Sequence, residues 1–323
     1  MESFNHITVL ERRLVDCMAI KPNDIAIDCT AGGGGHTALM LEAAEPSGRI
    51  LAIDRDPHAI NAIKSRFGHF ISQGRLIACH GKFSSINEFA SNSHVTGKVQ
   101  GICADLGFSS PQVDNSERGF AFSHDGPLDM RMDPSSGCPT AESIVNEADE
   151  ADLSRIFRDL GEEPKAKAMA RAIVKARSSK AIVTTKQLAD LASRVLVYGT
   201  KSKTHPATRI FQALRIKVNN ELGELEDLLD KAMSLLQPGG RLAIISFHSL
   251  EDRLVKSRFR EWSGLGPDLL PRDIPLTNLE IDSMRQTCGS IIKPFPYIPD
   301  EEECRANPRA RSAKLRVIEK LTQ

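Results

Sequence analysis

A short apolar stretch followed by four consecutive glycines is the feature that most constrains how this chain can fold. Ile25 to Ile27 run into Asp28, Gly32 to Gly35 follow closely, and a helical spacing of apolar residues begins near His36. Strand, glycine turn and helix in this order bring backbone close to a nucleotide-like ligand in an open parallel sheet. Glycine lacks a Cβ, so it can adopt positive φ and let a ligand approach the main chain. A flexible glycine linker is the alternative, and the strand and helix on either side argue against it.

The ligand can be narrowed from the acids near this turn. Gly33-x-Gly35-x-x-Ala38 fits a dinucleotide pattern, which alone is weak. The next apolar stretch ends at Asp54, where a carboxylate can accept the ribose hydroxyls of NAD or of S-adenosylmethionine. Asp28 stands where a positive amino group could lie, and the turn needs no pair of phosphates to explain it. These two features favour S-adenosylmethionine over NAD.

Composition predicts a soluble globular chain in a reducing compartment. Hydrophobic residues make up 41% and charged residues 26% of the 323 residues. An apolar run near 18 residues and a basic-then-apolar leader are both missing, so we expect neither a membrane span nor a signal peptide. The seven cysteines are scattered without a C-x-x-C pair. This usage favours the cytoplasm, with neither a disulfide framework nor a metal site.

Acidic residues end neighbouring predicted strands. Asp28 and Asp54 each follow an apolar stretch, and Asp105 follows Val99 to Ala104 in the same way. Because the carboxyl ends of central parallel strands line the ligand crevice, we expect all three carboxylates at one site. Phe83 follows another predicted strand and either covers an adenine ring or begins a helix as a core aromatic.

The pattern changes after the fourth predicted strand. From Gln112 to about 205 the sequence shows a long irregular loop, 118–133, and then helical spacings without a strand of the parallel sheet. From 206 a single long amphipathic helix, 211–236, is expected, followed by a strand at 241–247 and a closing pair at 291–293 and 313–317. No structure is predicted for 264–286. We therefore expect an α/β fold in which 1–111 and 206–323 form one discontinuous domain and 112–205 an inserted helical domain.

Basic residues concentrate in two runs although the net charge is zero. The runs, at 161–180 and 194–217, carry mostly cations: Lys165, Lys167, Arg171, Lys175, Arg177, Lys180, Arg194, Lys201, Lys203, Arg209, Arg215 and Lys217. Such runs are either solvated helix faces or phosphate contacts, and the sequence leaves both open. For the basic turn Asn307-Pro-Arg-Ala-Arg-Ser312, the sequence likewise fits either ordinary surface or a phosphate contact.

Several motifs, in order along nearly the whole chain, resemble one family. They are His6-Ile-Thr-Val-Leu10, Asp28-x-Thr-x-Gly-x-Gly-Gly-His36, Asp105-Leu-Gly-x-Ser-Ser-Pro-Gln112, Arg118-Gly-Phe through Asp133, Gly161-Glu-Glu, His205 to Arg215, Ser246 to Arg253 and Asn307 to Arg316. The sequence is similar to ribosomal RNA small subunit methyltransferase H, a bacterial family that methylates N4 of a cytosine in the decoding centre of 16S rRNA. This resemblance implies a class I methyltransferase (Rossmann-like) sheet with an inserted helical domain.

The resemblance also implies residue roles and partners. Gly34, Gly35 and His36 would contact the methionine portion of the donor, Asp54 the ribose and Phe83 the adenine, while Asp105 and Gln112 would complete the donor site. The loop has four glycines where the family more often shows a varied residue, but the spacing from Asp28 to His36 is kept. The implied substrate is 16S rRNA within the small ribosomal subunit, and the implied location is the cytoplasm. The resemblance implies neither a bound metal nor a membrane partner. The oligomeric state, a homodimer included, stays open.

The acceptor amine is the chemical difficulty, because the lone pair of cytosine N4 is delocalised into the ring. A hydrogen-bond acceptor beside N4 would favour a pyramidal nitrogen and later take its proton, which is worth roughly 10²–10⁴ in rate. Asp105 or a carbonyl within 106–110 is the first choice for this group. Ser109 and His248 are further candidates, and His248 is equally consistent with a packed histidine. The target base must leave its stack to enter.

Two other functions fit parts of the sequence. An NAD-dependent dehydrogenase on the same type of sheet would bind NADH and not the methyl donor. An RNA-binding ribosome-assembly factor with a vestigial donor site would keep its cellular function after Asp105→Ala.

Overall fold

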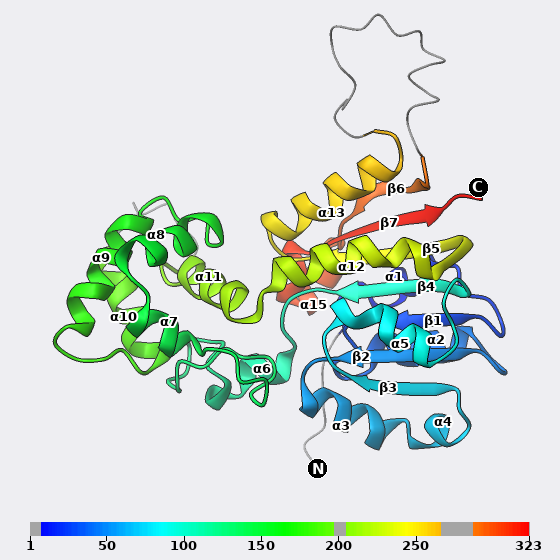
Figure 1. Cartoon of the computed structure of the whole chain (residues 1–323), viewed down its shortest axis with the longest axis horizontal. Helices are drawn as coiled ribbons and strands as arrows, with labels where there is room; N and C mark the ends of the chain where they lie inside the picture. The colour runs from blue at the N-terminus through cyan, green and yellow to red at the C-terminus, as the bar shows by residue number, and fades with distance from the viewer. Residues whose placement is uncertain (1–7, 197–204, 266–286, 323) are drawn as a thin grey trace, which may run out of the picture. The chain divides into compact units, whose positions relative to one another are not determined.

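The computed structural model describes residues 8–196, 205–265 and 287–322. Its strands form one seven-stranded sheet in the order β3-β2-β1-β4-β5-β7-β6 (Figure 1). Strands β1 to β5 are parallel, and β7 is antiparallel to both β5 and β6. The strand bounds are β1 (Ile25–Asp28), β2 (Arg49–Asp54), β3 (Leu76–His80), β4 (Val99–Asp105), β5 (Leu236–Ser246), β6 (Gly289–Tyr297) and β7 (Lys314–Lys320). The expected α/β class and the closing pair of strands are confirmed.

The strand order reverses between β1 and β4. Successive strands run outward from β1 through β2 to β3, and the chain then returns to place β4 on the other side of β1. In open parallel sheets ligands bind beside the carboxyl ends of the strands at such a switch point. Asp28 is the last residue of β1 and Asp105 the last of β4, so both lie at this place.

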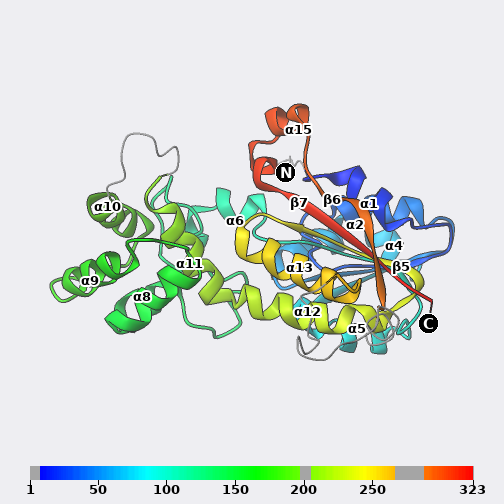
Figure 2. The same cartoon turned by 90° about the horizontal axis from the view of Figure 1, so that it is seen from above.

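Helices cover both faces of the sheet because the central strands are apolar on both sides. In β2, Ile50 and Ala52 belong to one core while Leu51 and Ile53 belong to the other, as the alternation of a strand requires. The first core includes residues of α1 (Glu11–Met18), α2 (Gly35–Ala43) and α3 (Pro57–Arg66), which is followed by the short α4 (Gly68–Ser72). The second includes residues of α5 (Ile86–Asn92), α12 (Glu221–Leu235) and α13 (Ser249–Trp262). Figure 2 shows α1 and α2 across the strands from α12 and α5.

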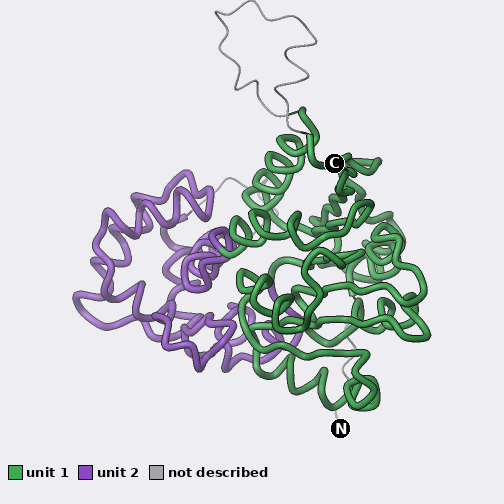
Figure 3. Tube along the Cα trace, turned by 45° about the vertical axis from the view of Figure 1, so that its right-hand side comes forward, with its two compact units in different colours: residues 1–107, 224–323 green, residues 108–223 purple. Residues whose placement is uncertain are grey.

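The chain divides into two compact units, coloured separately in Figure 3. Unit 1 consists of residues 1–107 and 224–323 and contains the sheet, together with the short α15 (Glu301–Ala306). Unit 2 consists of residues 108–223 and has its own apolar core. Its helices are α6 (Ser110–Asp114), α7 (Ala141–Glu147), α8 (Glu150–Asp159), α9 (Ala166–Arg177), α10 (Thr185–Val195) and α11 (Thr208–Asn219).

The long helix expected over 211–236 is wrong and is replaced by two helices. α11 ends at Asn219, its C-cap Asn220 has a left-handed φ of 50°, and α12 begins at Glu221. Ile210, Phe211 and Leu214 of α11 belong to the core of unit 2. The structure therefore ends the helical unit at residue 223 and not at 205, and begins it at 108 and not at 112. Apolar spacing by threes and fours continues across Asn220 and does not record the break, because it reports burial and not the backbone angle of one residue.

Some sequence features lie outside the described residues. These are Lys201, Lys203, most of the unpatterned stretch 264–286 and the first residues of the motif that starts at His6. In the part of the chain that is described, no helix is both long and apolar enough to cross a membrane. All seven cysteines are described and are free thiols.

Candidate active site

The turn between β1 and α2 is held by Asp28, which is 1% exposed. One carboxylate oxygen accepts a hydrogen bond from the Thr37 hydroxyl at 2.7 Å, and the other accepts from the Thr30 N–H at 3.1 Å. The acid therefore joins the start of the turn to the first turn of the helix. Both Asp28 oxygens bind protein groups, and each keeps a second lone pair to which the predicted amino group of a ligand can donate.

Close packing accounts for two of the four glycines. Gly34 has a φ of +81° and precedes α2, and a Cβ there would lie 2.8 Å from Cδ1 of Ile63. A Cβ on Gly35 would collide with the side chain of Thr8. Neither position tolerates a side chain, whichever ligand binds. His36, the next residue, is 4% exposed in the first turn of α2.

Asp54, at the end of β2, binds the glycine turn directly. Its Oδ2 accepts from the Gly32 N–H and its Oδ1 from the Asp56 N–H, both at 2.8 Å. Burial raises the pKa of Asp54 to about 6, although these two hydrogen bonds act to lower it. Each carboxylate oxygen has a second lone pair, so two ribose hydroxyls can still donate to it.

Asp105, at the end of β4, is connected to the same turn through its backbone. Its N–H donates to the Thr30 hydroxyl at 2.7 Å. Its side-chain Oδ1 is buried and has no hydrogen-bond partner among the described residues. Burial, and then the charges of Asp28 and Glu251, raise the pKa of Asp105 well above its ordinary value. A buried carboxyl oxygen without a donor is costly and is the place where a ligand N–H would be bound most favourably.

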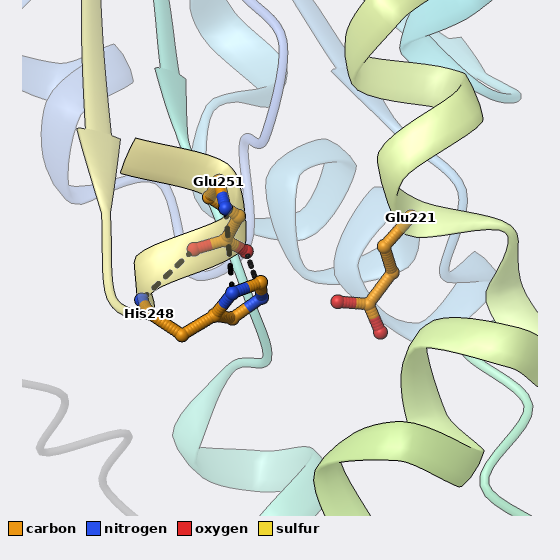
Figure 4. Close-up of side chains that lie close together, drawn as sticks. All are labelled: Glu221, His248 and Glu251. Carbon is orange, nitrogen blue, oxygen red and sulfur yellow. Dashed lines mark hydrogen bonds and ion pairs between the residues drawn. The ribbon is translucent and has the colours of Figure 1, made fainter. Parts of the chain in front are cut away.

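His248 caps the first turn of α13 (Figure 4). Its Nδ1 accepts from the Glu251 N–H at 3.4 Å, and its Nε2 lies 3.0 Å from Glu251 Oε1. Glu251 Oε2 in turn accepts from the N–H groups of Phe247 and His248 at 2.9 and 3.3 Å. Since Nδ1 accepts, a neutral ring carries its proton on Nε2. Nε2 is buried near Glu251 but makes no hydrogen bond among the described residues, so only Nδ1 is engaged in the helix start.

The remaining predicted residues divide between the two units. Phe83 begins the 3₁₀ turn η1 (Phe83–Ser85) and packs, partly buried, against the second core of unit 1. Ser109 and Gln112 belong to unit 2, where the Ser109 N–H donates to Gln112 Oε1 at 3.0 Å at the start of α6. The structure thus brings Asp28, Asp54 and Asp105 to one turn.

Three residues of the site were not singled out from the sequence. Thr30 joins Asp28 to Asp105, Thr37 joins Asp28 to α2, and Glu251 acts on both His248 and the pKa of Asp105. Thr30 and Glu251 lie within the motifs quoted above. A hydroxyl between an acid and a glycine run is the available signal, because short polar side chains bind nearby backbone groups in turns.

Comparisons with known proteins assign the family. A family model described as the MraW methylase family matches residues 3–321. Among solved structures, a putative rRNA-methylase from Clostridium thermocellum covers 98% of each chain at 12% identity with a TM-score of 0.44. An rRNA methylase from Streptococcus thermophilus also covers 98% of each chain at 12% identity, with a TM-score of 0.40. These two likenesses are distant, and the assignment rests on the family model.

The family decides between the two ligands weighed above. A methylase uses S-adenosylmethionine, so the dehydrogenase interpretation is wrong. The glycine turn, Asp54 and the unpartnered oxygen of Asp105 at the switch point are consistent with this donor. The chain belongs to the MraW methylase family, the family that its motifs resemble, and is an S-adenosylmethionine-dependent rRNA methyltransferase.

Proposed function

We propose that this protein methylates the exocyclic N4 amine of a cytidine in the decoding centre, the P site, of small-subunit 16S rRNA. The order of motifs from Asp28 to Arg316 supports the choice of acceptor. The observation that carries the chemistry is the buried Oδ1 of Asp105, which has no partner in the described structure and ends the strand beside the donor turn. The reaction would take place in the cytoplasm, consistent with seven free thiols.

The donor would be held by the groups around the turn. S-adenosylmethionine, when bound, supplies a methyl group already activated by a positive sulfur. Asp54 accepts the ribose hydroxyls, Phe83 lies beside the adenine, and the backbone of Gly34 and Gly35 with His36 contacts the methionine portion. Gln112 is the remaining residue proposed for donor binding. The tight turn fixes these groups in advance, which reduces the ordering needed on binding.

Asp105 would accept the hydrogen bond of the entering amine and then its proton. Burial and two nearby carboxylates keep its pKa high when the site holds no cation. A positive donor nearby would favour the carboxylate form, because an opposite charge stabilises the ionised acid. The carbonyl groups of 106–110 and the hydroxyl of Ser109 are secondary acceptors. His248 would cap the start of α13, and it is the weaker choice as a base because its Nδ1 lone pair already accepts from the Glu251 N–H.

Unit 2 would bind the RNA backbone through exposed cations on α9. Lys167, Arg171 and Lys175 are spaced four residues apart and all are exposed, so they form one stripe along the helix. Arg171 also lies 3.6 Å from Glu150. Exposed cations at regular spacing on one helix face suit phosphates.

The test is a tritiated-methyl assay on small subunits from a strain that lacks this protein, followed by nucleoside analysis. We expect label in N4-methylcytidine with the unaltered protein and none with Asp105→Ala. Label on a ring carbon or a ribose oxygen would overturn the proposed acceptor. Calorimetry with S-adenosylhomocysteine serves as the control for folding and donor binding.

The same assay separates the enzyme from an assembly factor with a vestigial donor site. Such a factor would incorporate no methyl group, and Asp105→Ala would leave subunit assembly in cells intact. Loss of the methyl mark in a strain that carries only Asp105→Ala would exclude this second function.

A further inference from the structure

Phe108 is an exposed aromatic side chain directly after the candidate active-site strand. Its side chain is 42% exposed. Among the described residues, the other exposed large apolar side chains are Val183, Leu265 and Ile298. Phe108 lies three residues after Asp105 and directly follows Gly107, whose φ is +99°. Exposure alone would be ordinary, so the feature that matters is what holds this ring in place.

A fixed guanidinium lies under the Phe108 ring. The Cζ of Arg215 is 4.8 Å from the ring centroid, and Arg215 is only 7% exposed. Glu221 holds Arg215 with two hydrogen bonds, of 2.8 Å from Nε and 2.7 Å from Nη2. A bidentate pair of this kind fixes the plane of the guanidinium, and the ring resting on it is therefore held in one orientation.

A second arginine and a second ring extend this arrangement within unit 2. The Phe108 and Phe120 ring centroids are 6.4 Å apart, and Arg118 lies 5.8 Å from the centroid of Phe120. Arg118 is anchored by Nη2, which donates to the carbonyl oxygens of Arg131 and Met132 at 3.1 and 2.8 Å. Phe120 itself is only 9% exposed, so Phe108 is the member of the cluster that is offered to solvent.

We infer that Phe108 stacks on a nucleobase of the RNA substrate and positions it for methyl transfer. Aromatic rings and guanidinium planes are the surfaces on which single-stranded bases stack, and any base offers a π face to them. A ring that rests on a guanidinium plane suits an aromatic base better than a purely apolar protein partner. The inference rests on the proposed function, because it gives Phe108 a role in binding the RNA substrate and none in binding the methyl donor.

The experiment compares Phe108→Leu with Phe108→Trp in the small-subunit methylation assay. Leucine keeps the apolar volume and removes the π face, whereas tryptophan keeps a stacking ring. We expect the KM for small subunits to rise about 5- to 100-fold in Phe108→Leu and to stay near its original value in Phe108→Trp. The affinity for S-adenosylhomocysteine should not change in either variant.

Val183→Ala is the matched control, since Val183 is also exposed in unit 2 and has no aromatic face. Equal KM values for Phe108→Leu and the unaltered protein would overturn the inference, and so would an equal loss in the leucine and tryptophan variants. Nucleoside analysis of the same samples separates this result from the proposed function. Label outside N4 of cytidine would refute the acceptor, whatever the KM values show.

Discussion

Three carboxylates end neighbouring strands of the sheet, yet each has a different set of partners. Asp28 is satisfied by a hydroxyl and an N–H of its own turn. Asp54 accepts two backbone N–H groups and keeps free lone pairs, and Asp105 has a buried oxygen with no partner in the described structure. Asp28 and Asp54 each accept one hydrogen bond on each oxygen, so only Asp105 differs, and this difference supports its proposed role toward the reacting amine.

Asp105→Asn should make the protein more stable at neutral and alkaline pH. A raised pKa means that the folded protein holds this proton more tightly than the unfolded chain. The stability that this proton contributes is fully present below about pH 4, the pKa of Asp105 in the unfolded chain. It is lost as the pH rises through the pKa of Asp105 in the folded protein. Asparagine does not ionise, so the gain in the free energy of unfolding over the unaltered protein should widen from pH 5 to pH 8.

Urea unfolding at several pH values measures this effect, and the methylation assay should show a loss of about 10²–10⁴ in kcat for the same variant. Parallel stability curves for the two proteins would contradict the raised pKa of Asp105. A stable variant with unchanged kcat would remove Asp105 from the chemistry.

Donor affinity should fall as the pH drops below about 6, which is the pKa of Asp54. Ribose hydroxyls donate to the ionised carboxylate, and protonation removes one acceptor and weakens the other. Affinity for S-adenosylhomocysteine should therefore decrease by at most about tenfold per pH unit below that pKa. Calorimetry between pH 5 and pH 8 measures the profile. In Asp54→Asn the profile should be flatter and the affinity lower throughout, and an identical slope in this variant would assign the titration to another group.

The glycine turn and the start of α13 show how single elements contribute to the site. At the turn, the backbone must approach Ile63 and the Thr8 side chain closely, which excludes side chains at Gly34 and Gly35. At α13, His248 takes the place that serine or aspartate usually holds at a helix start, and it pairs with Glu251 three residues on. Glu251 is 2% exposed, so its charge acts on Asp105 with little screening.

His248→Ala should lower the free energy of unfolding by about 0.5–2 kcal/mol, because the cap of α13 is removed. His248→Asn should recover most of this stability, since asparagine is a good cap. If the ring only positions Glu251, kcat of the asparagine variant should stay within a few-fold of the original value. Thr184→Ala, which removes the cap of α10 in unit 2, is the matched control for stability. A loss of kcat above about 100-fold in the stable asparagine variant would show instead that the ring takes part in catalysis.

For the molecule as a whole, charge is distributed unevenly although the net charge is zero. Unit 2 carries the exposed stripe of cations on α9, and unit 1 carries the three buried or half-buried acids at the strand ends. This separation is consistent with one unit that binds a polyanion and another that binds a cationic donor.

Charge reversal of the stripe should weaken RNA binding without affecting the donor. In Lys167→Glu/Lys175→Glu we expect a higher KM for small subunits and a shallower dependence of log KM on log salt, by about 0.7–0.9 for each phosphate that the protein no longer neutralises. Lys98→Glu, an exposed change before β4 in unit 1, is the control. Salt slopes that match in both variants would mean that the stripe is an ordinary solvated face.

Much of the fold followed from local sequence. Strands β1, β2 and β4 were predicted from apolar stretches that each end in an acid, and α2 from the glycine run and the helical spacing after it. These patterns record burial over a few neighbouring residues. The order of motifs identified the family without any structure. The single helix expected over 211–236 was wrong, since the left-handed Asn220 interrupts an apolar spacing that continues on both sides.

The sequence by itself determined the class of sheet, the family and the cluster of acids at the strand ends, because those properties depend on residue order and periodicity. Only the tertiary structure decided which acid keeps an unpaired oxygen, that the His248 ring faces Glu251, and that Phe108 is exposed on a fixed arginine. Each of these depends on partners that other elements or other turns of the chain supply. The physical reason is that hydrogen bonding, charge and exposure at one residue are set by what the fold places beside it.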